Sequence, residues 1–215
     1  MSPDLFIAGG ASGRMALANY IQPRLGPVPK QLKGHKGRPA AVLVGLQWCD
    51  AAATASAVEG WHVIMTERAG HLAHHAGQIS FPGGKVEDAD GDLSMTALRE
   101  AAEEIDLAAR DVTLLGGLDP VLSPVGFVVQ PVVAVVETGV SLVAEPNEVA
   151  AILHLPLGHV LDVTNHRRDN YVRNGESRDF WVIDHPQHYL WGLSATILVD
   201  LAQRLAGQMG LQTDQ

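Results

Sequence analysis

Cysteine, aromatic residues and long apolar runs are all scarce in this chain. Its single cysteine, Cys49, excludes an internal disulfide, so we expect a reducing compartment. The first ten residues carry no basic stretch, and their apolar run, Leu5–Ala8, is too short for a signal peptide. Because no run reaches the roughly 18 apolar residues of a membrane span, no transmembrane helix is expected. The sequence therefore predicts a cytoplasmic protein without a membrane partner.

The chain also has few positively charged residues. The chain has 15 Lys and Arg against 24 Asp and Glu, which gives a formal net charge of −9. This balance argues against nucleic acid or an anionic membrane held by a basic surface. An acidic protein can still bind an anionic substrate if a bound cation reverses the local field. A small-molecule partner is therefore favoured, while the oligomeric state stays undetermined and a homodimer stays open.

Apolar residues make up 47% of the chain, enough for one α/β domain. A helix is expected over 11–22, followed by a linker rich in Pro, Gly and Lys. We expect this segment, 1–37, to pack on a main domain formed by 38–210. Apolar runs predict strands at 40–46, 62–66, 112–118, 127–136 and 180–183, and helices at about 92–107, 157–163 and 191–205. This order predicts a mixed sheet sandwiched by helices.

The most informative element is the acidic helix near residue 100. At about 100° per residue, Glu100, Glu103 and Glu104 fall within one arc of roughly 100°. Such a face is either solvated or a site for Mg²⁺ or Mn²⁺, which prefer hard oxygen ligands. The opposite face would pack on the sheet through Ser94, Leu98, Ala101, Ala102 and Ile105.

A glycine-containing turn precedes this helix. Phe81-Pro82-Gly83-Gly84 is followed by Lys85, an acidic loop and then Arg99-Glu100-Ala101-Ala102-Glu103-Glu104. This stretch resembles the Nudix box, with Gly84 at its start. It departs from the general pattern in three ways: the gap from Gly84 to Arg99 is one residue longer, Asp90 stands for the first Glu, and Asp106 stands for the late Gly.

The resemblance extends beyond the box to the coenzyme A diphosphatase branch of the Nudix family, over roughly 38–205. Upstream, it rests on Thr66-Glu67-Arg68-Ala69 and Gly77-Gln78. Where that branch carries an Arg, this chain has Ala73. Downstream, it rests on Ser123-Pro124-Val125-Gly126-Phe127, Gln130-Pro131-Val132-Val133, Asn147-Glu148-Val149 and Tyr189-Leu190-Trp191-Gly192-Leu193-Ser194-Ala195.

The resemblance implies a Nudix fold, an α/β/α sandwich around a mixed β-sheet, and substrates in which a nucleoside diphosphate is linked to another group. Diphosphates repel a nucleophilic water, so divalent metals must neutralise their charge. We expect Glu100 and Glu104 to bind the metal, and Glu103 to act as a third ligand or as the base. The remaining site residues are Arg99, which would orient a carboxylate, and Arg68, Lys85, Gln78 and Gly84, which would meet the substrate.

Two further candidates keep alternative interpretations. Glu148 is either a further ligand or the base, as loop glutamates are in some Nudix enzymes, or an ordinary solvated residue. The histidines at 71, 74 and 75 have no cysteine nearby, which favours a substrate-side loop over a structural metal site.

Three functions remain open on the sequence alone. The first is hydrolysis of coenzyme A or acyl-coenzyme A to adenosine 3′,5′-bisphosphate and 4′-phosphopantetheine, or its acyl form. The second is hydrolysis of ADP-ribose or another nucleotide sugar, which Ala73 favours. The third is a ligand-binding module without catalysis, which the retained Glu100, Glu103 and Glu104 argue against.

Overall fold

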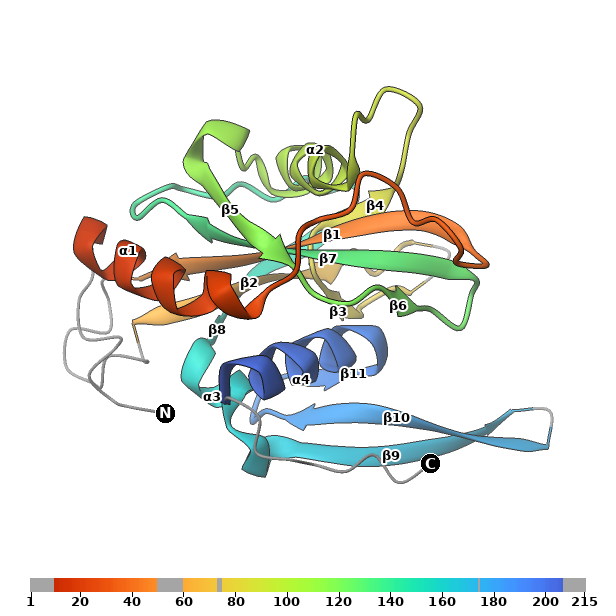
Figure 1. Cartoon of the computed structure of the whole chain (residues 1–215). Helices are drawn as coiled ribbons and strands as arrows, with labels where there is room; N and C mark the ends of the chain where they lie inside the picture. Colours follow the sequence, from red (N-terminus) through yellow and green to blue (C-terminus); the bar gives the residue numbers. More distant parts are fainter. Residues whose placement is uncertain (1–9, 50–59, 73–74, 174, 207–215) are drawn as a thin grey trace.

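A computed structural model describes residues 10–49, 60–72, 75–173 and 175–206, and a mixed eight-stranded sheet lies at its centre (Figure 1). Its two central strands, β1 (Arg38–Trp48) and β7 (Phe127–Val136), run parallel. Both are long, nearly continuous apolar runs, as expected of strands buried on both faces. The path is β3-β2-β1-β7-β5, with β4, β6 and β8 pairing off it.

The remaining strands of this sheet are antiparallel to their neighbours. They are β2 (Trp61–Arg68), β3 (Ile79–Ser80), β4 (Gly83–Lys85), β5 (Val112–Gly117), β6 (Val121–Leu122) and β8 (Val149–Pro156). Strand β2 pairs with the end of β1, at Leu46–Trp48, whereas β4 pairs with its start, at Ala40–Val42. The sheet therefore divides beside β1, between β4 and β2.

Helices cover both faces of the sheet. On one face lies α2 (Leu93–Ile105); on the other lie α1 (Gly10–Ile21), α3 (Leu157–Leu161) and α4 (Gly192–Ala206) (Figure 1). Single 3₁₀ turns occupy Gln22–Arg24, Ala109–Asp111 and Val163–Asn165. The two faces bury separate apolar clusters, one around α2 and the other around α1 and α4. The predicted α/β/α sandwich around a mixed sheet is confirmed.

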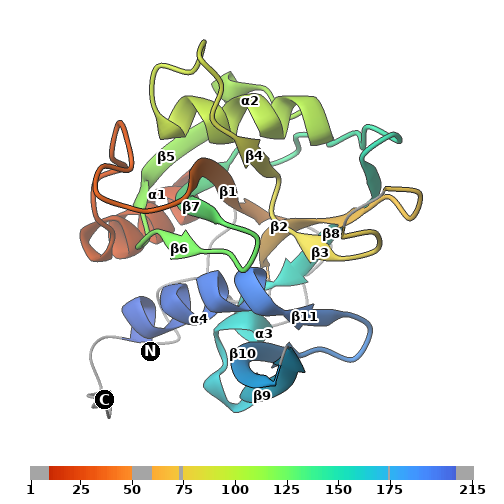
Figure 2. The ribbon, with the colours of Figure 1, turned by 90° about the vertical axis from the view of Figure 1, so that its right-hand side faces the viewer.

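A second, three-stranded antiparallel sheet was not predicted. It consists of β9 (His166–Arg173), β10 (Glu176–Asp184) and β11 (Tyr189–Trp191), and its long hairpin projects past α4 (Figures 1 and 2). Only 180–183 was expected as strand here. The rest of the hairpin is rich in charged residues, such as Arg167 and Asp169, and therefore lacks the apolar signal of a strand.

Element boundaries near the acidic helix also differ from the prediction. Helix α2 starts after Asp92, whose side chain accepts a 2.9 Å hydrogen bond from the Met95 amide, and ends at Ile105 rather than 107. Asp106 takes the left-handed conformation, with φ 54°, that ends a helix. Pro82-Gly83-Gly84, expected as a turn, leads into strand β4, and β8 was missed. Among the described residues, no helix is long and apolar enough to cross a membrane.

Candidate active site

The glycines of β4 bring the backbone close to both β1 and α2. Pro82 accepts a 2.8 Å hydrogen bond from the Leu43 amide, which fixes the approach of the segment to β1. A Cβ on Gly83 would lie 2.5 Å from the Ala41 carbonyl oxygen, and a Cβ on Gly84 would overlap the carboxylate of Glu100. Gly83 therefore allows the close approach to β1, and Gly84 leaves the Glu100 carboxylate of α2 in its place.

Arg99 forms the centre of a charged network at the start of the site. Its Nε and Nη2 donate to the two carboxylate oxygens of Asp90, both at 3.1 Å. Thr96 Oγ1 and the Glu87 amide also donate to Asp90, at 2.8 and 3.0 Å. These contacts, led by Arg99, lower the pKa of Asp90 to about 2. Asp90 thus holds Arg99 in place. Nothing in the sequence indicated that Thr96 contacts Asp90, apart from its position in the first turn of α2.

The same guanidinium reaches two of the predicted metal-site carboxylates. Arg99 Nη1 lies 3.0 Å from Glu100 Oε1 and 3.1 Å from Glu103 Oε2, and Nη2 donates to the Lys85 carbonyl at 3.0 Å. The Glu103 side chain is 59% exposed, whereas that of Glu100 is 15% exposed. Burial raises the pKa of Glu100, and Arg99 opposes this shift. Arg99 therefore orients Glu100 and holds Glu103 at the solvent side.

Glu104 lies on the packing face of α2, which corrects the predicted division of the helix. The residue is 3% exposed and sits beside Ala101 and Ile105, whereas Ala102, expected to pack, is exposed. Burial, only partly offset by the charge of Arg68, raises the pKa of Glu104 to about 8. Its Oε2 has no hydrogen-bond partner among the described residues. A buried carboxylate oxygen of this kind is costly unless a ligand satisfies it.

The segments that carry Arg68 and Glu148 meet at the end of β2. The Ala69 amide donates to the Glu148 carbonyl at 2.8 Å, and the Arg68 amide donates to the Gln78 carbonyl at 3.0 Å. The charge of Glu148 contributes to the raised pKa of both Glu100 and Glu104. Glu148 itself is exposed and makes no side-chain ion pair within the described part of the chain. The charges of Arg68 and Glu148 therefore both act on Glu104.

The other predicted substrate residues lie around this group. Gln78 directs its side-chain oxygen to His75 Nδ1 at 2.7 Å, and Lys85 follows Gly84 with an exposed side chain. His71 and His75 are exposed, whereas His74 and Ala73 lie outside the described residues.

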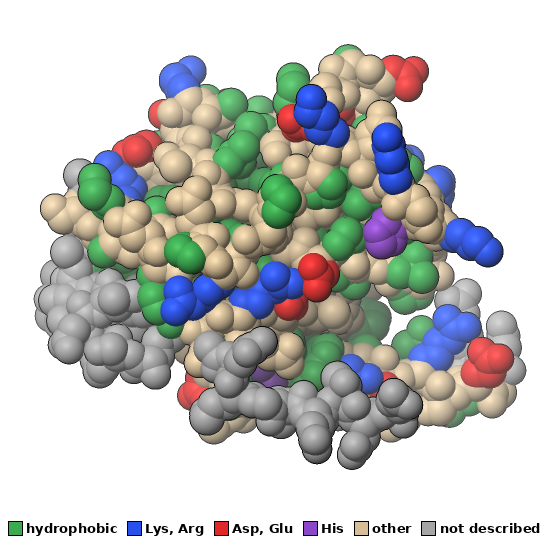
Figure 3. Space-filling view, viewed as in Figure 1, with side chains coloured by type: hydrophobic (Ala, Val, Ile, Leu, Met, Phe, Trp, Pro, Cys, Tyr) green, Lys and Arg blue, Asp and Glu red, His purple; other side chains and the backbone are tan. Residues whose placement is uncertain are grey.

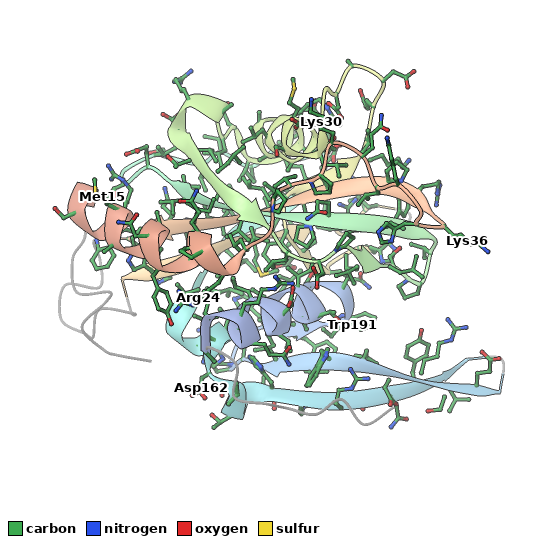
Figure 4. The ribbon with its side chains drawn as sticks, in the orientation of Figure 1. Met15, Arg24, Lys30, Lys36, Asp162 and Trp191 are labelled. Carbon is green, nitrogen blue, oxygen red and sulfur yellow. The ribbon has the colours of Figure 1, made fainter. Side chains whose placement is uncertain are left out.

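The carboxylates suit a hard divalent cation. Glu100 and Glu104 offer carboxylate oxygens, and Glu104 Oε2 is buried without a partner among the described residues. The Glu100 carboxylate occupies the space beside Gly84 that a Cβ would fill. No group of three His, Cys, Asp or Glu side chains forms a ready cation site in the segments described. Mg²⁺ is commonly held by one or two carboxylates together with waters and substrate phosphates, so this arrangement fits it. Glu103, paired with Arg99, stands at the edge of the group. Side chains fill the space between α2 and the sheet (Figure 4).

Known proteins similar to this chain were found by sequence and by structure. The profile of the NUDIX domain matches residues 50–181. A protein of Photorhabdus laumondii, described as the uncharacterized Nudix hydrolase NudL, is 36% identical over 187 residues, 87% of this chain and 95% of that protein. A protein of the same description from Salmonella paratyphi B is 37% identical over 143 residues, 66% of this chain and 74% of that protein. The structure of a MutT/nudix family protein from Enterococcus faecalis aligns with 84% of this chain and 66% of that chain, at 15% identity and a TM-score of 0.48.

Proposed function

The chain belongs to the Nudix hydrolase family, and on this premise we propose that it hydrolyses the diphosphate linkage of coenzyme A or acyl-coenzyme A. The products would be adenosine 3′,5′-bisphosphate and 4′-phosphopantetheine, or its acyl form. At the level of class, the chain is a hydrolase of nucleoside diphosphate derivatives. The identity of the substrate is the part that we propose.

The observation that carries the chemistry is the buried carboxylate of Glu104, whose Oε2 has no hydrogen-bond partner among the described residues. The charges of Glu100 and Glu148 add to the raised pKa of Glu104, which Arg68 opposes, and the charge of Glu148 also adds to the raised pKa of Glu100. A buried carboxylate with an oxygen that lacks a partner and with like charges nearby is costly to ionise unless a bound cation compensates for it. This grouping therefore supports a site for Mg²⁺ or Mn²⁺ held by Glu100 and Glu104.

Each residue then has a defined task. A divalent cation, when bound, would neutralise the diphosphate and make a water more acidic. Arg99, fixed by Asp90, keeps Glu100 in position through its 3.0 Å hydrogen bond. Of the two candidate bases, Glu103 is held by Arg99, whereas Glu148 is exposed and makes no ion pair within the described residues. We therefore favour Glu148 as the proton acceptor, with Arg68 contacting a substrate phosphate.

The proposal for the substrate depends on the segment from the end of β2 to β4. This segment carries the Arg68 and Gln78 positions of the coenzyme A branch, and its start is joined to Glu148 by the 2.8 Å hydrogen bond of Ala69. A substrate that entered the carboxylate group from this side would contact Arg68 and Gln78. Ala73, which replaces an Arg of that branch, favours the second candidate, ADP-ribose or another nucleotide sugar.

A product assay separates these candidates. Purified protein would be given coenzyme A, dephospho-coenzyme A and ADP-ribose with Mg²⁺ or Mn²⁺, and the products separated by chromatography. We expect adenosine 3′,5′-bisphosphate from coenzyme A, with a high KM. Ala73→Arg should lower the KM for coenzyme A about tenfold, and less for dephospho-coenzyme A, which lacks the 3′-phosphate. If ADP-ribose is cleaved efficiently and coenzyme A is ignored by both proteins, the substrate proposal is wrong.

A further inference from the structure

A pocket that is separate from the carboxylate group lies between the loop before β1 and the start of α2. Its volume is about 310 Å³. Polar side chains of Lys30, Gln31 and Lys33 form one part of its lining, and the apolar side chains of Leu32, Val86 and Leu93 form another. None of these six residues has a task in the proposed hydrolysis. A volume of this size is at the lower end of small-molecule sites, which span about 300–1,000 Å³.

The lysines of this acidic chain are concentrated in and beside the pocket. All four lysines of a chain with net charge −9 lie at 30, 33, 36 and 85, and no Asp or Glu occurs between Asp4 and Asp50. Every ion pair in the described part of the chain uses an arginine, so these ammonium groups have no carboxylate within 4.0 Å there. In Figure 4, Lys30 lies near α2 and Lys36 at the outer end of the loop, and Figure 3 shows Lys and Arg side chains along this edge. The edge therefore presents unpaired positive charge.

The loop is held in place by its apolar residues. Val28, Leu32 and Val86 pack against the cluster around α2, which includes Leu93 and Ala97. The Lys33 amide donates to the Gln31 carbonyl at 3.0 Å, so the backbone turns tightly on either side of Leu32. Lys30 and Lys33 consequently project from an anchored turn, which reduces the entropy that a ligand must overcome to bind them.

The carboxylates of the loop that precedes α2 form no ion pair with these lysines. Asp90 is bound to Arg99 through both oxygens, and Asp92 accepts from the Met95 amide at 2.9 Å. Glu87 and Asp88 of the same loop are exposed and lack an ion pair in the described ranges. An anion bound at Lys30 and Lys33 would therefore displace no existing ion pair.

We propose that this pocket is a second binding site, which takes a nucleotide. Lys30 and Lys33 bind its phosphates, and the apolar surface of Leu32, Val86 and Leu93 receives its base. A nucleotide is favoured over a free phosphate because the pocket combines cations with an apolar wall and is larger than one phosphate group. The proposal does not depend on which diphosphate the carboxylate site hydrolyses.

The test is a titration of the full chain, labelled at Leu and Val methyl groups, in the presence of a chelator. ADP, inorganic diphosphate and adenosine are added separately, and shifts of the Leu32, Val86 and Leu93 methyls are followed by NMR. We expect ADP to shift these methyls with an affinity at least tenfold above that of diphosphate or adenosine. Lys30→Gln and Lys33→Gln should each weaken ADP binding at these methyls, and the double variant at least tenfold, whereas Lys36→Gln, which removes one such charge outside the pocket, should change it less than either single variant.

Three results would overturn the proposal. The first is the absence of shifts at these methyls at millimolar ADP. The second is an equal loss with Lys36→Gln, which would indicate a diffuse charge effect rather than a site. The third is equal affinity for diphosphate and ADP, since diphosphate has no base to contact the apolar wall. Unchanged thermal melting of the double variant would show that a loss of binding does not come from unfolding.

Discussion

Two acidic residues beside α2, Asp90 and Glu104, have opposite surroundings. Asp90 accepts hydrogen bonds from Arg99, Thr96 and the Glu87 amide, and its pKa falls to about 2. Glu104 has an oxygen without a partner among the described residues, and its pKa rises to about 8. The first carboxylate is stabilised by the fold itself. The second is destabilised by the fold, which is expected of a group that gains its partner only from a ligand.

The largest expected effect is on catalysis. Glu104→Gln and Glu100→Gln should each lower kcat at least about a hundredfold, the scale of losing one well-placed charged group. The reason is that both remove a carboxylate from the proposed cation site without changing the shape of the side chain. Steady-state rates with coenzyme A or ADP-ribose at saturating Mn²⁺ provide the measurement.

Glu103→Gln is the matched control on the same helix. Its carboxylate is 59% exposed and paired with Arg99, so we expect a smaller loss than for Glu104→Gln. A loss as large as that of Glu104→Gln would favour Glu103 as ligand or base, as the sequence predicted. Near-normal rates in both Glu100→Gln and Glu104→Gln would remove the basis of the proposed site.

The close approach of β4 offers the next test. A Cβ on Gly84 would overlap the Glu100 carboxylate, so Gly84→Ala should push that group out of position. We expect kcat to fall about tenfold to a hundredfold, since misplacement by about 1 Å has this effect. Gly91→Ala is the control, because its Cβ would meet only the flexible end of Met95, at 3.0 Å. Equal rates for the two variants would contradict the importance of this contact.

Asp90→Asn tests the carboxylate that the fold itself stabilises. It leaves Arg99 without its paired carboxylate, so the free energy of unfolding at pH 7 should drop by about 1–3 kcal/mol, the range for hydrogen bonds to charged groups. The folded-state pKa of about 2 lies below the ordinary 3.8, so this stabilisation is present above about pH 4 and is lost as the pH falls toward 2. Urea unfolding across this range measures the difference.

Asp88→Asn serves as the control, because Asp88 is exposed on the same loop. We expect it to change the free energy of unfolding by less than about 0.5 kcal/mol, as is usual at the surface. If Asp90→Asn behaved in the same way, Arg99 would not depend on Asp90 for its position.

The contrast between Asp90 and Glu104 also shows what a sequence can predict. Strand β7 was predicted at 127–136 and found as Phe127–Val136, because a continuous Val-rich run allows few alternatives. The hairpin β9–β10 was missed because its charged residues hide the strand pattern. The three helix carboxylates were identified from their spacing, and their roles stay predictions.

The burial of Glu104 could not be deduced from the helix itself. Spacing places Glu100, Glu103 and Glu104 on one arc, but the exposure of each depends on β4, which packs below Glu100, and on Arg68 at the end of β2. These partners are distant in the sequence. The same holds for the Asp90–Arg99 pair, whose members are nine residues apart and meet only because the loop folds back over the helix.

The smallest expected effect concerns the stability of the metal-free protein. The pKa of Glu104 rises from 4.5 to about 8 on folding, so the folded state holds a proton that the unfolded state releases. Stability should therefore fall as the pH rises from about 4.5 to 8, and Glu104→Gln, which cannot ionise, should abolish this fall. In chelator at pH 8, we expect the variant to be more stable than the wild type by about 1 kcal/mol or more, and equally stable near pH 4. Glu103→Gln should show no such pH-dependent gain, because its side chain is exposed.

Adding Mn²⁺ should then stabilise the wild type and not Glu104→Gln, since a ligand that binds only the folded state raises its stability. A wild type whose stability is flat between pH 5 and 8, and is unaffected by Mn²⁺, would show that burial of Glu104 is unrelated to metal binding.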